Sequence, residues 1–239
     1  LAGLPLVKPS HAVAGDASAF ITTLGTRAVE IMKSRDTSTF TEREAQFRTL
    51  LEEGFHLKTI SRFVIGKYWK EASDTQKHDY DAVFVDFLTR VYAARFDAYS
   101  GQTFEVVQTV QESGGDQWVR TRINRPDGGQ PIAVDYRVRD FEGKYKVVDV
   151  VVEGTAVLNT HRVEFASVVN KRGFDGLIAE LKAHPEAGDH VVCSDDVYGG
   201  SLRILDKVFK HQGIECTRVD ATDLAQVEQA VTPRTRLVW

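Results

Sequence analysis

The chain has 239 residues, the length of one large domain or of one domain with a small addition. A hydrophobic content of 42% with 27% charged residues is typical of a globular chain with a core and excludes wholesale disorder. Thirty basic and 34 acidic residues give a net charge of −4, so the chain lacks the overall positive charge that nucleic-acid binding uses, and we expect no nucleic-acid partner.

The N-terminal residues are open to two interpretations. Residues 1–7 are mostly apolar, and residues 12–14, Ala-Val-Ala, have the small-x-small spacing of a signal-peptidase site. Residues 1–14 are therefore expected to be a partial signal peptide or a disordered tail. The cysteines, Cys193 and Cys216, lie in the last fifth of the chain, which excludes a disulfide framework for the main body.

Residues 16–100 carry helical signals, with apolar residues recurring at helical spacing through 20–31, 47–55 and 57–68. A capping box is expected at residues 41–44, Thr-Glu-Arg-Glu. Another, Ser-Asp-Thr-Gln at 73–76, opens a helix whose wide aromatic stripe runs to Tyr99.

After Gly101 the period changes from helical to alternating. Strands are expected at 103–109, 118–124, 132–140 and 145–152, joined by glycine-containing turns as an antiparallel meander. The last strand is apolar on both faces, so it should be covered on both sides. Helical patterning returns at residues 163–170 and 174–181. The fold class is therefore α+β, with N-terminal helices packed on a curved antiparallel sheet.

Few residues have a pattern typical of catalysis. His11, His56, His78 and His161 share no metal-ligand spacing, and no nucleophile-elbow, zinc-protease or phosphate-loop motif occurs, so we expect neither a metal nor a catalytic site. Asp149 lies within an apolar strand, where its pKa could be raised for use as a base. A structural carboxylate with a salt bridge or hydrogen bonds is the other interpretation.

Four features taken together resemble the MlaC family of periplasmic phospholipid carriers, also called toluene-tolerance auxiliary proteins, over about residues 15–184. They are Phe-Val-Ile-Gly-Lys-Tyr-Trp at 63–69, the aromatic helix that runs into Gly-Gln-Thr at 101–103, the strand end from Asp149 to Gly154, and Asn-Lys-Arg-Gly at 170–173. A cleaved leader is usual in the family, which favours the signal-peptide interpretation of residues 1–14.

The resemblance implies a non-enzymatic periplasmic protein that holds the acyl chains of a phospholipid in a cavity between its helices and its sheet. Family members carry lipid between an outer-membrane lipoprotein complex and an inner-membrane ABC transporter, through its MlaD component. Some relatives are associated with hopanoid biosynthesis, so the lipid could also be of that kind. The residues that we expect to line the cavity are Phe63, Phe84, Phe87, Leu88, Val91, Tyr92, Phe96, Val134, Tyr136, Val138, Val148 and Val150.

The sequence changes character at residue 188. Residues 188–239 predict strands at 191–193, 214–219 and from 236, with helices between them, which is a β-α-β-α-β unit of a parallel sheet. The unit resembles a piece of the cystathionine and methionine-lyase group of pyridoxal-phosphate enzymes, in which Tyr198 matches the tyrosine that stacks on the cofactor. We therefore expect a lipid-binding domain at 15–187 and an enzyme-like fragment at 188–239.

The fragment lacks most of what that resemblance requires. No Ser-x-Thr-Lys segment supplies a Schiff-base lysine, and Lys207 and Lys210 do not match its motif. We accordingly expect no pyridoxal phosphate and no lyase activity. A natural fusion and an artefact both explain the fragment. A ketosteroid-isomerase type of enzyme with Asp149 as base is the remaining alternative for the main body.

Overall fold

The computed structural model describes residues 14–93, 99–182, 189–196 and 214–238. These form two compact units. One contains the described residues up to Trp69 and those from Tyr99 to Phe165, and the other contains Lys70–Ala93 and the described residues from Ala166 onward. The division of the chain near residue 188 does not coincide with these units and stays a prediction. The predicted cleavage site falls at the edge of residues 1–13, which lie outside the described residues.

Helices α1 (Ala14–Lys33), α2 (Phe40–Gly54) and α3 (Leu57–Ile65) belong to the first unit, with the 3₁₀ turn η1 (Ser34–Asp36) after α1. The N-cap of α2 is Thr39, whose hydroxyl accepts a hydrogen bond from the Glu42 amide at 3.2 Å, while the Glu42 carboxylate accepts one from the Thr39 amide at 2.8 Å. The capping box expected at 41–44 is therefore wrong by two residues, because Thr41 and Glu44 repeat the spacing of the true pair.

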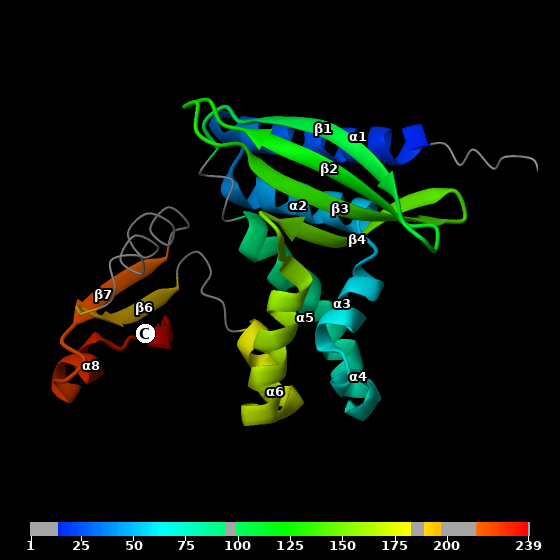
Figure 1. Cartoon of the computed structure of the whole chain (residues 1–239). Coiled ribbons are helices and arrows are strands. Elements are labelled where there is room, and N and C mark those ends of the chain that lie inside the picture. Colours follow the sequence, from blue (N-terminus) through cyan, green and yellow to red (C-terminus); the bar gives the residue numbers. More distant parts are fainter. Residues whose placement is uncertain (1–13, 94–98, 183–188, 197–213, 239) are drawn as a thin grey trace, which may run out of the picture. The chain divides into compact units, whose positions relative to one another are not determined.

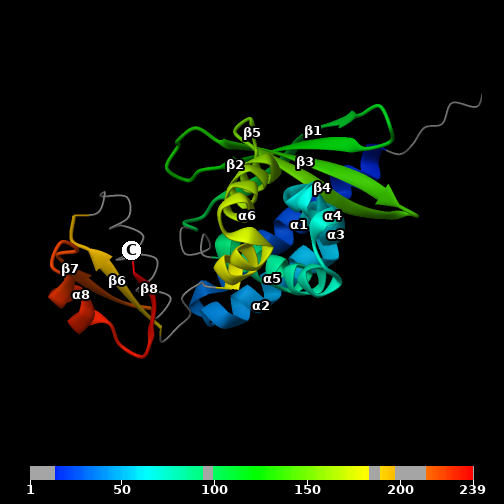
Figure 2. The same cartoon turned by 90° about the horizontal axis from the view of Figure 1, so that it is seen from below.

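The sheet of this unit has the strand order β1-β2-β3-β4-β5 and is antiparallel throughout. Its strands are β1 (Thr103–Gln111), β2 (Gln117–Asn124), β3 (Ile132–Phe141), β4 (Lys144–Val152) and the short β5 (Thr155–Ala156). The four predicted strands are confirmed, and β5 is an addition to them. Helices α1 and α2 lie on the same side of this sheet (Figures 1 and 2).

Helix α1 packs closely on β1 because Gly25 has no side chain. A Cβ atom at Gly25 would lie 2.3 Å from the Phe104 ring. Helix propensity alone favours Ala over Gly by about 1 kcal/mol, but a clash of this size opposes it. We expect Gly25→Ala to lower the free energy of unfolding by about 1–3 kcal/mol, measured by urea denaturation. Thr26→Ala, at the exposed neighbouring position, is the control, and a stabilised Gly25→Ala protein would contradict the expectation.

The second unit contains α5 (Asp74–Ala93), and helix α6 (Val157–Lys182) begins in the first unit and ends in the second. The predicted capping box at 73–76 is confirmed, since Gln76 and Ser73 exchange hydrogen bonds of 3.2 and 3.0 Å. Gly173 interrupts α6 with a φ of 73°, a conformation that favours glycine, which separates the two predicted helical stretches.

Helix α5 packs against the last part of α6. The Tyr80 and Phe174 rings meet edge to face at 5.8 Å, Gln76 donates to the Asp175 carboxylate at 2.9 Å, and the Arg90 guanidinium donates to the carbonyl oxygen of Leu181 at 2.9 Å. The expected end of the aromatic stripe, beyond Ala93, falls on residues 94–98, which are not among the described ones.

The C-terminal segment forms a small parallel sheet of order β7-β6-β8, as the sequence predicts. Its elements are β6 (His190–Ser194), β7 (Glu215–Val219), the short helix α8 (Leu224–Ala230) and β8 (Thr235–Val238). The buried His190 ring joins the three strands, with its nitrogens 2.8 Å from the hydroxyls of Thr235 and Thr217. The helix predicted between the strands at 191–193 and 214–219 falls on residues 197–213, which are not among the described ones. Among the residues described, no helix is long and apolar enough to cross a bilayer.

Candidate functional site

The face of the large sheet that contacts α1 carries a continuous set of mostly apolar side chains. Phe104 lies against Gly25 of this helix, and the ring of Tyr145 lies 6.3 Å from that of Phe20. Strand register aligns the other members in rows across the sheet. We call this set the helix-covered face; its members are Phe104, Val106, Val119, Thr121, Val134, Tyr136, Val138, Tyr145, Val147, Val150 and Val152.

A β-bulge in β4 decides which residues of that strand belong to this face. Tyr136 pairs with Val150, but Val138 pairs with Val147, so Val148 is the extra residue between them. A bulge interrupts the alternation of side chains, which the sequence pattern cannot show. Strict alternation from Val150 predicts Val148 as the partner of Val138 on the helix-covered face. The partner is instead Val147, although Val148 is also buried.

Tyr136 lies in the middle of the helix-covered face, between Val119 on β2 and Val150 on β4. Its ring meets that of Phe104 nearly edge to face at 6.4 Å. Burial raises the pKa of the Tyr136 hydroxyl to about 12. The side chain nevertheless remains partly accessible, as do Phe104, Val150 and Val152, whereas Val119, Val134, Val138 and Val147 are buried. The face thus combines fully buried residues with others that are only partly buried.

The predicted cavity residues are divided between the two compact units. Phe63 and the five sheet residues belong to the first, whereas the predicted residues on α5 belong to the second. On α5, Phe84 and Leu88 are buried, and Phe87, Val91 and Tyr92 are half-buried. Phe63 is 39% exposed on α3, and Phe96 lies outside the described residues.

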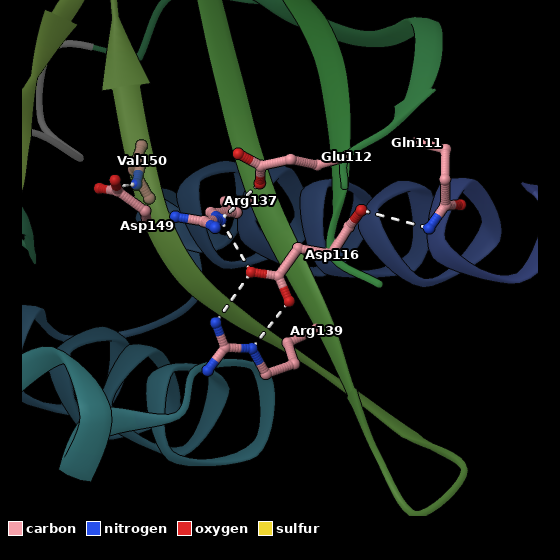
Figure 3. Close-up of polar contacts among 7 residues, drawn as sticks. All are labelled: Gln111, Glu112, Asp116, Arg137, Arg139, Asp149 and Val150. Atoms are coloured by element: carbon pink, nitrogen blue, oxygen red, sulfur yellow. Dashed lines mark hydrogen bonds and ion pairs between the residues drawn. The ribbon is translucent and has the colours of Figure 1, made fainter. Parts of the chain in front are cut away.

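Asp149 lies on the opposite face of the sheet, which we call the outer face, across from Arg137 (Figure 3). Desolvation raises the pKa of its carboxyl, against the opposing effects of the Val150 amide, which donates to it at 2.8 Å, and of Arg137. The carboxylate therefore cannot reach a molecule held against Tyr136. The ketosteroid-isomerase alternative requires Asp149 to face the interior, whereas Asp149 lies opposite Arg137, which favours a structural role for it.

The outer face also holds an ion-pair network around Asp116 (Figure 3). The Arg139 guanidinium donates two hydrogen bonds to the Asp116 carboxylate, at 2.7 and 2.9 Å, and Nε of Arg137 lies 2.8 Å from Asp116 and 2.9 Å from Glu112. These arginines hold the pKa of Asp116 below its usual range, despite the opposing effect of burial. The network connects the β1–β2 turn to β3, which is a structural arrangement.

Sequence reasoning missed several members of the helix-covered face, notably Phe104, Val119 and Val147. The alternation of Phe104 and Val106 in β1 could have indicated the first of these. Val119 and Val147 depend on the pairing between strands, which a bulge at Val107 and another at Val148 shift by one residue.

The described residues do not fit a metal or pyridoxal phosphate. Among them, no group of three His, Cys, Asp or Glu side chains could hold a metal ion. The described part of the C-terminal segment, 189–196 and 214–238, contains no lysine whose amine could form a Schiff base with the cofactor. Tyr198, Lys207 and Lys210 lie outside the described residues.

The helices and the five-stranded antiparallel sheet define an α+β domain. Residues 23–183 match the family described as MlaC protein, and the chain belongs to this family. Its fold is similar to that of a phospholipid-binding protein from Ralstonia solanacearum, solved in complex with a phospholipid. The TM-score is 0.59 and the identity 24%, over 70% of this chain and 95% of that one.

The C-terminal residues match a second family. Residues 159–239 match the Cys/Met metabolism PLP-dependent enzymes, so the two matches share residues 159–183, most of α6. Cystathionine gamma-synthase of Mycobacterium tuberculosis is 51% identical over 59 residues, which are 25% of this chain and 15% of that enzyme. A probable cystathionine gamma-synthase of Herpetosiphon aurantiacus is 44% identical over 79 residues, 33% of this chain and 23% of that protein. The chain thus spans less than a quarter of these relatives, and the predicted resemblance to part of the enzyme is confirmed.

Proposed function

We propose that residues 15–187 form a phospholipid-binding carrier that takes up the acyl chains of one lipid against the helix-covered face. Membership of the MlaC family supports this, as does the phospholipid bound by the Ralstonia protein of the same fold. The single observation that carries the proposal is the helix-covered face itself. Mostly apolar side chains from four strands lie in register under a helix, and Phe104, Tyr136 and Val150 in this set are only partly buried.

The energetics of transfer explain why such a protein is needed. At about 0.8 kcal/mol per methylene, two acyl chains of about fifteen methylenes each cost roughly 24 kcal/mol to expose to water. An apolar lining removes that cost without any covalent step. Our proposal is therefore that this part of the chain acts by binding and not by catalysis.

The finer proposal concerns the route of the lipid. We infer that the protein works in the periplasm and carries phospholipid between an outer-membrane lipoprotein complex and the MlaD-type component of an inner-membrane ABC transporter. Family membership supports this inference. Delivery requires the carrier and its partners to have comparable affinities for the lipid, because a lipid held too tightly is not released. A hopanoid-related lipid is the alternative cargo.

We propose that residues 188–239 are a separate, enzyme-derived segment without lyase activity. Its support is that the segment has no Ser-x-Thr-Lys sequence to supply a Schiff-base lysine, and that Lys207 and Lys210 do not match this motif. Lipid binding by the main body should not depend on the chemistry of this segment.

Extraction of the purified protein with organic solvent, followed by mass spectrometry, tests the main proposal. We expect phospholipid to be recovered in an amount close to that of the protein, because an apolar interior retains its ligand through purification in water. Exchange into vesicles that contain a labelled phospholipid should load the same site. Repeated recovery of no lipid, together with no uptake of the labelled one, would contradict the proposal, and recovery of polycyclic lipid alone would favour the hopanoid-related cargo.

A further inference from the structure

The outer surface of α3 and the residues that follow it have an unusual charge distribution. From residue 54 to residue 70 the chain has no Asp or Glu, but it has four Lys or Arg side chains. Lys58 and Lys67 are exposed, and Arg62 is half-buried. The buried side of α3 is formed by Ile60, Ser61, Val64 and Ile65. Lys58 and Arg62 are not part of that side, and Lys67 follows the end of the helix.

Aromatic rings lie among these cations. The guanidinium of Arg62 stacks on Trp69, with its carbon 3.2 Å from the ring centroid. Arg162, on the first part of α6, lies over Phe63 at 5.1 Å, and its guanidinium closely approaches Gly66. Phe63 is 39% exposed despite this contact. We call this set the basic–aromatic patch, formed by Lys58, Arg62, Phe63, Lys67, Trp69 and Arg162.

This combination fits the surface of an anionic bilayer better than the surface of a protein. Arg and aromatic side chains are common at protein interfaces, but lysine, of which the patch has two exposed, is depleted there. A bilayer with anionic lipids presents charge of one sign, to which each nearby Lys or Arg adds attraction. Trp side chains favour the layer of lipid headgroups, and Phe is common on the apolar face of helices that lie in the membrane interface.

We propose that the basic–aromatic patch is a docking surface for anionic membrane. The protein would bind the bilayer surface through this patch, with the cations facing the lipid headgroups and Phe63 at the depth of the headgroups. The proposal goes beyond lipid binding in the interior, since it assigns a second site, on the surface, to a membrane rather than to a single lipid molecule.

Sedimentation with vesicles tests this proposal in the full chain. Wild-type protein should bind vesicles of equimolar phosphatidylglycerol and phosphatidylcholine, bind pure phosphatidylcholine weakly, and be released by high salt. The double variant Lys58→Glu/Lys67→Glu should bind the anionic vesicles about thirtyfold more weakly. Phe63→Ser should weaken binding severalfold without changing its dependence on salt, because it removes an apolar contact and no charge.

The charge-matched control is Lys171→Glu/Lys182→Glu, at two exposed positions of α6 outside the patch. Each double variant takes the net charge from −4 to −8. Equal losses in both would overturn the proposal, because total charge would then explain them. Absence of wild-type binding, or equal binding to neutral vesicles, would overturn it too, and binding of an acidic protein in place of vesicles would assign the patch to that class of partner. Lipid extracted from the same preparations reports separately on the proposed function.

Discussion

Replacement of Val150 by Trp is expected to lower the phospholipid that copurifies with the protein by at least about tenfold, which corresponds to ~1.4 kcal/mol of binding free energy. Val150 is half-buried beside Tyr136, in the accessible middle of the helix-covered face. The indole would occupy volume that the acyl chains need while keeping the surface apolar. The ratio of extracted phosphorus to protein measures the effect.

The adjacent residue supplies a matched control. Val151 is also half-buried and lies in the same strand, but it pairs with Asp135 and belongs to the outer face. Val151→Trp should therefore retain lipid close to the wild-type level. If the indole at residue 150 prevents folding, Val150→Phe provides a smaller increase in volume at the same position. Equal retention of lipid by folded variants at 150 and 151 would show that the helix-covered face is not the binding surface.

Loss of the Asp116 carboxylate should destabilise the sheet. The Asp116 side chain is only 5% exposed and pairs with Arg139 and Arg137, whose side chains are 42% and 33% exposed. Truncation of a buried member of an ion pair costs several kcal/mol, but exposed partners are screened by solvent. We therefore expect Asp116→Asn to lower the free energy of unfolding by about 1–3 kcal/mol, measured by urea denaturation at pH 7.

The difference in free energy of unfolding between wild type and Asp116→Asn should become smaller in acid. The folded-state pKa of Asp116 lies below its value in the unfolded chain, so the stabilisation is complete above about pH 4 and is lost as the pH falls through the lower, folded-state pKa. The difference between wild type and Asp116→Asn should shrink over that acidic range. Asp127→Asn is the control, because its carboxylate pairs with Arg125 in an exposed turn and should matter little. A difference that does not change down to pH 2 would contradict the role of this carboxylate.

Local sequence signals predicted the elements of the main body well. Alternation and glycine-containing turns located four strands, and the capping box at Ser73 located the start of α5, because these signals depend on residues close together in the chain. The capping box of α2 shows the limit of such signals. Thr39 and Thr41 both have a Glu three residues later, and only the folded chain shows which pair caps the helix.

The candidate site was predicted less completely. Tyr136, Val134 and Val138 were placed together on one face correctly, since they follow strict alternation within one strand. Their neighbours on other strands depend on register. Because β4 has one extra residue at its bulge, Val147 and not Val148 pairs with Val138 on this face. Phe63 fits the apolar helical pattern, yet it lies on the side of α3 that stacks with Arg162.

The sequence by itself determined the order of helices and strands, the α+β class, the MlaC resemblance and the change of family near the C-terminus, because each is encoded in short-range pattern. Only the tertiary structure decided that Asp149 lies on the outer face while Tyr136 lies on the helix-covered face, and that Gly25 admits the ring of Phe104. The physical reason is that cross-strand hydrogen bonding and close packing join residues far apart in the chain, so no local periodicity specifies them.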